Sequence, residues 1–357
     1  MDDDVTEVTA GLVCAHHHLY SSLARGMPPP PKVPANFLEI LENVWWRLDT
    51  ALDLEMIEWS AKLGALDALE AGTTAIIDHH ESPRAIEGSL SVIADSVNEV
   101  GVRINTTYGI TDRHGTDGAA RGLAENDRYL TELAASSSAS QLGLRAGMVG
   151  VHAAFTCSDD SLAAAADLAA RHGVGVHIHV AEGPDDVGAE ERIRDLTCDN
   201  WLLVHGVHLP TDHGLHGTIV HNPRSNMNNS VGYADPARFS NRVVLGTDGI
   251  GADMLSEFQL SYVKQRDHDV SATPDAAWSW MASGWELFPG ALTDSVTWSY
   301  PVIEPWHVAF TPTIRAIDVD INGEPALRDG VATRVDADEI RAKAVEQAVR
   351  LHRALES

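Results

Sequence analysis

The chain has 357 residues, of which 44% are hydrophobic, and its formal net charge at pH 7 is −27. This composition allows a large core, but it lacks the clustered cations that binding to nucleic acid requires. The three cysteines are widely spaced, no apolar stretch approaches the length of a membrane span, and the acidic start Met1–Asp4 is unlike a signal peptide. We therefore expect a cytoplasmic protein without nucleic-acid or membrane partners.

Short apolar runs alternate with helical stretches through most of the chain, which is the pattern of βαβ units. Long helices are predicted over residues 52–71 and 162–172. Eight strands are predicted over residues 12–15, 73–77, 102–108, 148–151, 176–179, 202–205, 218–220 and 243–245. Each strand is followed by polar residues, and eight strands with polar C-terminal ends predict a (β/α)8 TIM barrel over residues 11–290.

The pattern changes after residue 290. Strands are predicted over residues 295–298 and 317–321, and Asn322-Gly323 after the second strand is typical of a hairpin turn. An alanine- and arginine-rich amphipathic helix is predicted over residues 339–355. We therefore expect residues 291–357 to form a separate unit of β-structure and one helix.

Metal-type side chains gather at the ends of the predicted strands. His16 and His18 follow the first strand and should point to the same side, because side chains alternate along a strand. The fifth strand supplies a further histidine, and Asp248 follows the eighth strand. Three imidazoles and one carboxylate suit a single divalent cation with an open position for water. Glu182 and His205 remain to move protons, so the pattern indicates an enzyme that activates water.

Eight short motifs occur in a fixed order between about residues 11 and 255. They are Gly11–Met27, Ala71–Thr74, Tyr108–Gly115, His152–Thr156, His177–Glu182, His205–Leu209, His221–Asn229 and Leu245–Gly249. Each motif is weak alone, but the ordered set is specific. The chain resembles the amidohydrolase superfamily, in its cytosine deaminase/chlorohydrolase (ATZ/TRZ) branch, and within that branch it is most similar to the SsnA aminohydrolases.

This resemblance implies roles for individual residues. The metal ligands would be His16, His18, His179 and Asp248. The catalytic residues would be Glu182 as proton shuttle, His205 and Asp248. Other correspondences place Arg25, His152 and Asn226 at the substrate, although Arg25 could equally pair with a local carboxylate. Trp45 and Trp46 are expected to pack in the core rather than against a ligand.

The number of metal ions follows from a missing residue type. Relatives with two metal ions carry a carboxylated lysine on a barrel strand, and no predicted strand of this chain contains lysine. We therefore expect one divalent ion per chain. Histidine and aspartate ligands suit zinc and iron almost equally, with zinc as the first candidate.

The resemblance also implies a reaction. A divalent cation lowers the pKa of bound water from ~15.7 to about 7, so that hydroxide is available at neutral pH. Glu182 would carry the water proton to a ring nitrogen or to leaving ammonia. The expected activity is hydrolysis of a C–N bond that is not a peptide bond, by deamination of a cyclic amidine or nucleobase-like small molecule. A chlorohydrolase-type displacement is an alternative.

The chain departs from the family at its beginning. Relatives have about sixty residues before the first HxH motif, which form part of a small β-sandwich, and this chain has only residues 1–10 there. We therefore expect a partial C-terminal sandwich without its N-terminal half, whose apolar face would be exposed or would recruit another subunit, as in a homodimer. A second alternative follows: a truncated or degenerate family member that binds metal without turnover.

Overall fold

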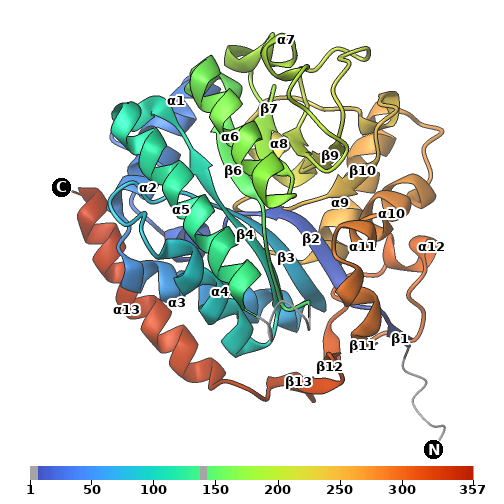
Figure 1. Ribbon diagram of the computed structural model, residues 1–357. Helices are drawn as coiled ribbons and strands as arrows, with labels where there is room; N and C mark the ends of the chain where they lie inside the picture. Colours follow the sequence, from blue (N-terminus) through green and yellow to red (C-terminus); the bar gives the residue numbers. More distant parts are fainter. Residues whose placement is uncertain (1–6, 137–142, 357) are drawn as a thin grey trace, which may run out of the picture.

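The computed structural model describes residues 7–136 and 143–356. Its centre is a barrel of eight parallel strands, seen in Figure 1. They are β2 (Leu12–His17), β3 (Thr73–His80), β4 (Arg103–Ile110), β6 (Val149–Ala153), β7 (Val176–Val180), β8 (Leu202–His205), β9 (Thr218–His221) and β10 (Val243–Leu245), with β5 (Arg145–Gly147) paired to β4. A parallel bridge between His17 and Asp248 joins the two ends of the sheet. The TIM barrel predicted from the sequence is confirmed.

Helices surround the barrel. They are α1 (Phe37–Ile40), α2 (Trp46–Ala51), α3 (Leu54–Glu70), α4 (Ser89–Val100), α5 (Gly115–Ala135), α6 (Asp159–His172), α7 (Ala189–Ile193), α8 (Pro223–Asn228), α9 (Met254–His268), α10 (Pro274–Ala282), α11 (Gly284–Leu287), α12 (Pro305–Val308) and α13 (Ala337–Glu356). None of them is long and apolar enough to cross a membrane.

The barrel wall is thinnest after β7 and β8. A three-residue 3₁₀ helix, Pro184–Asp186, and the five-residue helix α7 follow β7, and the described segment between β8 and β9 holds no helix. The side chain of Arg238 braces this segment, because it donates hydrogen bonds to the carbonyl oxygens of Gly206, Val207, Leu209 and Ala234. Hydrogen bonds from one side chain to backbone carbonyl oxygens thus stabilise this segment, which has no helix of its own to pack on the barrel.

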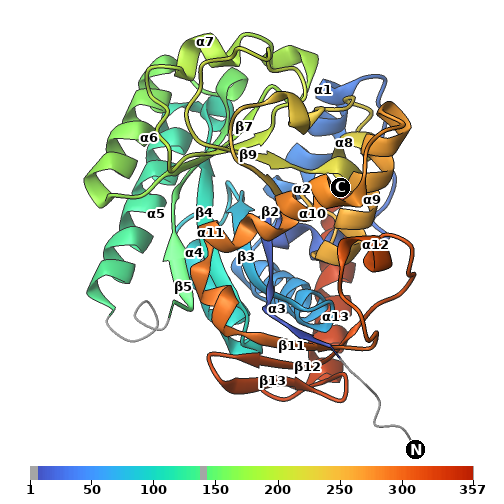
Figure 2. The same cartoon turned by 90° about the vertical axis from the view of Figure 1, so that its right-hand side faces the viewer.

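A second, antiparallel sheet lies below the barrel (Figure 2). Its order is β1 (Val8–Thr9), β11 (Ser295–Trp298), β12 (Ala316–Ile321), β13 (Glu324–Arg328) and β14 (Val331–Ala332). The hairpin turn predicted at Asn322-Gly323 is present, and both residues have the positive φ values, 58° and 75°, that such a turn requires. The sheet therefore combines a strand from before the barrel with four strands from after it.

The expectation of an unpartnered apolar face on this sheet is wrong. Val296, Trp298, Val319 and Ile321 are fully buried in the same cluster as the helices around the barrel. Their neighbours in sequence point the other way and are mostly polar. This outer face therefore gives no reason for a second subunit, and the homodimer stays an untested expectation.

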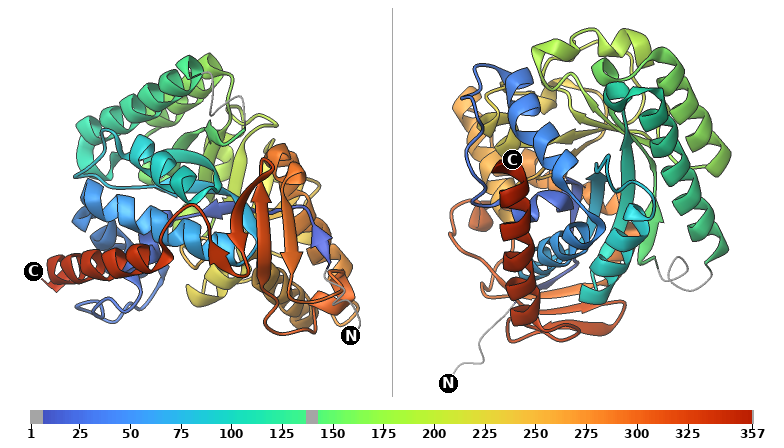
Figure 3. Two further views of the ribbon diagram at one scale, coloured as in Figure 1. Left: turned by 90° about the horizontal axis from the view of Figure 1, so that it is seen from below. Right: turned by 90° about the vertical axis from the view of Figure 1, so that its left-hand side faces the viewer.

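Two contacts fasten the sheet to the barrel. Trp298 packs on Gly72, where a Cβ atom would lie 2.2 Å from the indole, and the φ of Gly72 is 77°. Arg103 of β4 donates through Nε and Nη2 to the Asp294 carboxylate, at 2.9 and 2.6 Å, and neither side chain is exposed. Helix α13 then leaves the sheet and runs along the barrel against α3 (Figure 3).

Candidate metal centre and active site

The side chains of the site reach the barrel axis because the strands break their alternation. Val13 and Ala15 belong to the apolar cluster inside the barrel, so strict alternation would turn His16 outward. A shift in register between Cys14 and His17 lets His16 follow Ala15 inward. On β8 the interior residue Val204 is followed directly by His205, whose φ is 73°. A left-handed backbone is unfavourable for histidine, and such strain is commonly kept at functional sites.

The imidazoles of the site share one orientation. Nδ1 of His18 and Nδ1 of His179 donate hydrogen bonds to the carbonyl oxygens of His79 and His152, at 2.6 and 2.5 Å. Nδ1 of His205 lies 2.8 Å from Oδ1 of Asn226. Because each Nδ1 has a hydrogen-bond partner, each Nε2 is left to face the centre of the barrel. This is the arrangement of histidines that bind metal.

The free nitrogens converge on Asp248. Oδ1 of Asp248 lies 3.5 Å from Nε2 of His16 and 3.0 Å from Nε2 of His18, and its Oδ2 lies 3.9 Å from Nε2 of His205. The ligand atoms of His16, His179 and His205 also lie within 4.8 Å of one another. The Nε2 atoms of His16 and His205 are buried without a hydrogen-bond partner. A divalent cation would complete these unpaired atoms, so the donor set fits a metal ion.

The pKa values of the site fit the same donor set. Burial lowers the pKa of both His16 and His179 well below its ordinary value, which keeps these imidazoles neutral. Burial also acts to lower the pKa of His18, but Asp248 outweighs it and raises that pKa to about 9. Burial acts to raise the pKa of Asp248, yet the imidazoles of His16 and His18 beside its carboxylate hold it well below its usual range. A cation bound here would displace the proton of His18.

Glu182 lies at the edge of this cluster, and its carboxylate is within 4.8 Å of ligand atoms of His205 and Asp248. Its Oε2 is 3.4 Å from Nε2 of His205, and Nδ2 of Asn229 donates to its Oε1 at 3.4 Å. Burial and the nearby charge of Asp248 raise the pKa of Glu182 well above its ordinary value. Ser225 donates a hydrogen bond to Oδ2 of Asp248. Glu182 is therefore a carboxyl group suited to exchange protons next to the predicted metal ligands.

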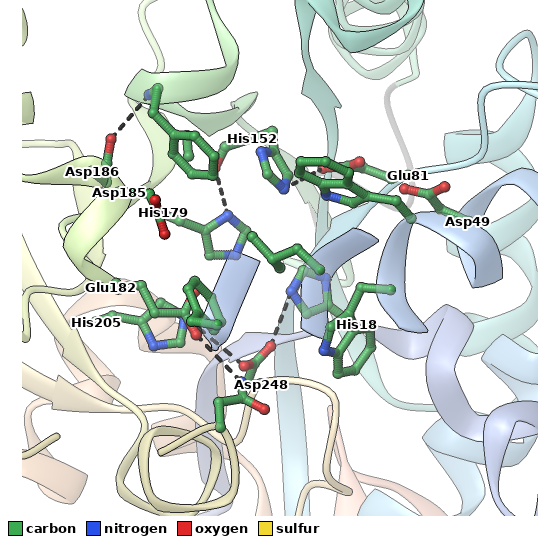
Figure 4. A pocket seen from close by; sticks show the side chains of 18 of the residues that line it. His18, Asp49, Glu81, His152, His179, Glu182, Asp185, Asp186, His205 and Asp248 are labelled. Atoms are coloured by element: carbon green, nitrogen blue, oxygen red, sulfur yellow. Dashed lines mark hydrogen bonds and ion pairs between the residues drawn. The ribbon is translucent and has the colours of Figure 1, made fainter. Parts of the chain in front are cut away.

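A pocket opens above the ligands, and its walls are largely aromatic (Figure 4). The pocket and the open space at its mouth together hold about 640 Å³. Residues Leu41–Trp45 form a π-helical turn between α1 and α2, and this wider turn shifts the helical phase. Phe37, Leu41, Trp45 and Trp46 consequently all line the pocket. The two tryptophans pack against the apolar clusters, as expected, and they also face the pocket.

The sequence did not predict four acidic residues of the pocket wall, which are Asp185, Asp186, Asp49 of α2 and Glu81 after β3. Asp49 and Glu81 form a pair. Figure 4 shows their carboxylates side by side. Both bond to the guanidinium of Arg113, which also lies 4.5 Å from the Trp46 ring centre. Glu81 follows His79 and His80 at a strand end, as the predicted ligands do, and that signal was available in the sequence. Asp49 carried no comparable signal.

The structure separates the three predicted substrate residues. His152 lines the pocket, and its Nε2 lies 3.7 Å from Oε1 of Glu81. Asn226 is buried behind His205 and does not line the pocket. Arg25 is half-exposed outside the pocket and bonds to Oδ2 of Asp67 at 2.5 Å. Arg25 thus forms the local ion pair that the sequence left open as its alternative.

Comparison with known proteins decides the family. The model described as "Amidohydrolase family" matches residues 8–281. The chain belongs to the amidohydrolase family. The superfamily predicted from the motifs is confirmed, while the likeness to the SsnA subgroup stays a prediction.

The most similar amidohydrolase relatives include several named deaminases. The 5'-deoxyadenosine deaminase of Methanocaldococcus jannaschii is 25% identical over 94% of this chain and 87% of that protein. The 8-oxoguanine deaminase of Pseudomonas aeruginosa is 28% identical over 78% and 68%. The 5-methylthioadenosine/S-adenosylhomocysteine deaminase of Thermococcus sibiricus is 27% identical over 74% and 65%. The chain therefore spans between 65% and 87% of the length of these relatives.

Solved structures repeat the fold of this amidohydrolase over nearly the whole chain. A zinc-bound adenosine deaminase from Xanthomonas campestris has a TM-score of 0.81 at 20% identity, covering 97% of this chain and 86% of that one. A variant of atrazine chlorohydrolase TrzN from Arthrobacter aurescens TC1, bound to zinc and atraton, has a TM-score of 0.82 at 18% identity, covering 97% and 89%. At this identity the likeness concerns the fold.

Proposed function

We propose that this amidohydrolase is a metal-dependent deaminase of an amino-substituted nitrogen heterocycle. One divalent ion, with zinc as first candidate and iron as second, would be held by His16, His18, His179 and Asp248. His205 is near enough to join the ligands in some states. The observation that carries the proposal is the buried, unpaired Nε2 of His16 beside the carboxylate of Asp248. Neutral nitrogen donors with one carboxylate suit either metal.

The residues around the ion would divide the chemical work. The ion would lower the pKa of a bound water from ~15.7 to about 7. Glu182 would take up the water proton and return it to a ring nitrogen or to leaving ammonia. His205, held through Nδ1 by Asn226, would direct Nε2 toward the oxygen that gains negative charge. Asn229 would keep Glu182 turned toward the reacting atoms.

The pocket supports a flat, nitrogen-containing substrate. Indole and phenyl rings of Trp45, Trp46, Phe37 and Phe155 offer faces for a planar ring. The relatives named for purine-type substrates favour a nucleobase or nucleoside-like compound. A chlorohydrolase reaction remains the second candidate, because the same water attack displaces chloride from a triazine.

A substrate screen tests this proposal. The zinc-loaded and the iron-loaded chain are each assayed for ammonia release from aminated purines, pyrimidines and triazines, and for chloride release from chlorotriazines. We expect ammonia from at least one heterocycle and loss of that activity after chelation. Turnover of exocyclic peptide bonds alone would contradict the proposal. Full metal content without any turnover would favour the alternative of a metal-binding relative that is not an enzyme.

A further inference from the structure

Two carboxylates and one guanidinium form a buried cluster at the pocket wall, away from the metal ligands. Nη2 of Arg113 lies 3.1 Å from Oδ2 of Asp49 and also bonds to Oε2 of Glu81. The side chains of Asp49 and Glu81 are only 2% and 5% exposed, and that of Arg113 is 10% exposed. Arg113 itself does not line the pocket, whereas both carboxylates do. The pocket is therefore faced by the acidic side of this cluster.

The charge of the whole pocket has the same sign. Six of the described lining residues are acidic, and none is lysine or arginine. They are Asp49, Glu81, Glu182, Asp185, Asp186 and Asp248. Asp186 accepts hydrogen bonds from the backbone N–H groups of Phe155 and Ala181, and Asp248 belongs to the metal ligands. Asp49 and Glu81 share one guanidinium between two carboxylates, which leaves an acceptor surplus at this wall.

The surplus of acceptors is visible as carboxylate oxygens that lack a hydrogen-bond donor. Oδ1 of Asp49 is buried without a hydrogen-bond donor among the described residues. Oε1 of Glu81 is 3.7 Å from Nε2 of His152, which is beyond hydrogen-bond length. Burial raises the pKa of both carboxyl groups, so the pair tends to share a proton. A bound cation would compensate this charge in place of the proton.

The geometry points to a substrate that carries a positively charged nitrogen group, an ammonium or amidinium, recognised by Asp49 and Glu81. This inference rests on the proposed function, because it assumes that the reacting ring lies at the metal ligands. His152 connects the two places: its ring is 5.7 Å from the ring of His179, and its Nε2 is near Glu81. A ring seated over His179 would thus reach the carboxylates with a short substituent. The indole of Trp46 would also attract a cation.

Matched ligands test this inference independently of turnover. The probes are 9-(2-aminoethyl)adenine, 9-(2-hydroxyethyl)adenine and 9-(carboxymethyl)adenine, with the same three substituents on melamine as a second scaffold. Binding to the zinc-loaded full chain is followed by tryptophan fluorescence, since Trp45 and Trp46 line the pocket. We expect the ammonium probe to bind about tenfold more tightly than its hydroxyl counterpart on at least one scaffold, because close charge pairs contribute that much or more. The carboxylate probe should bind most weakly.

Single-charge variants locate the preference. Asp49→Asn and Glu81→Gln should each reduce the ammonium preference to within about threefold, while the exposed control Asp338→Asn should keep it. Thermal melts confirm that each variant is folded. If one of the two variants does not fold, the other is enough to test the inference. Equal binding of ammonium and hydroxyl probes, or no binding on either scaffold, would overturn the inference. If the protein prefers the ammonium probe but releases no ammonia in the substrate screen, the proposed function is overturned. If it releases ammonia but does not prefer the ammonium probe, only the present inference is overturned.

Discussion

The two ends of the barrel both bury charged side chains, but only one end completes their hydrogen bonds. At the lower end, Arg103 bonds to Asp294 through two nitrogens and to Asn322 at 2.9 Å, with the ion pair fully buried. At the mouth, Asp248 lies among histidines whose Nε2 atoms include two without partners. The lower cluster is closed, and the upper cluster is open toward a cavity.

This difference separates a structural role from a candidate functional one. A buried polar atom without a partner costs about 1–3 kcal/mol, so a fold that keeps several in one place gains something else from them. The mouth also holds the left-handed residues Ala181, His205 and Asp248. Unpaired nitrogens and backbone strain therefore coincide where a cation and a substrate would bind. The following substitutions test the contrast, beginning with the largest expected effect.

Replacing Asp248 should abolish metal binding at the barrel mouth and leave the ion pair at the lower end intact. Asp248→Ala removes the only carboxylate among the proposed ligands and the partner of both His16 and His18. We expect bound metal, measured by elemental analysis after dialysis, to fall below about one tenth of one ion per chain, because the ligand set loses both charge and geometry. Activity should fall with it.

The matched control is Asp199→Ala, since that aspartate is 95% exposed on the surface. It should retain full metal content and normal melting behaviour. Full occupancy in Asp248→Ala would contradict the ligand assignment and remove the distinction between the two ends.

Glu182→Gln should separate metal binding from turnover. Glutamine is nearly the same size but cannot accept the proton of the water, and Glu182 is not among the proposed ligands. We expect a loss of ~10²–10⁴-fold in kcat with metal content unchanged, the usual contribution of a general acid/base. Glu191→Gln, on the exposed surface of α7, is the control. Activity of Glu182→Gln within a few-fold of wild type would transfer the proton role to Asp248 or His205.

Breaking the ion pair at the lower end should lower the free energy of unfolding and leave metal binding and turnover unchanged. Asp294→Ala leaves the guanidinium of Arg103 buried without its carboxylate, which typically costs about 3–5 kcal/mol of unfolding free energy. Urea denaturation would measure this, and the remaining folded protein should bind metal normally. Arg341→Ala is the comparison, because its pair with Glu70 is half-exposed and should contribute about 0–1 kcal/mol. A loss of metal affinity in folded Asp294→Ala would show that the two ends are coupled.

The contrast between the ends also explains what the sequence could predict. Strand positions, and the fact that His16 and His18 point to the same side, follow from local alternation and strand ends. The inward direction of His16 depends instead on the register shift between Cys14 and His17, which local alternation does not predict. The predicted strand over residues 295–298 coincides with β11. Predicted strands ended too early where polar residues continue the strand: β3 extends to His80, because its histidines are buried.

The misses arise from contacts between distant segments. Asp49 and Trp46 reach the pocket through a π-helical turn, which a period of 3.6 residues does not anticipate. Which face of the lower sheet is covered depends on how the sheet packs against the barrel. The sequence of the strands alone does not show that the apolar face is the covered one. Arg25 lies near a ligand in sequence, but its ion pair with Asp67 of α3 holds it elsewhere.

The smallest expected effect concerns Asn226, for which two roles compete. The resemblance places it at the substrate, whereas the structure places its Oδ1 2.8 Å from Nδ1 of His205 and buries it. If it positions His205, Asn226→Ala should reduce kcat or metal affinity by about 10–100-fold and leave KM nearly unchanged, as for other groups that orient histidines at metal sites. A rise in KM with kcat preserved would assign it to the substrate. Arg25→Ala is the control, because an exposed ion pair outside the pocket should alter activity by no more than about twofold.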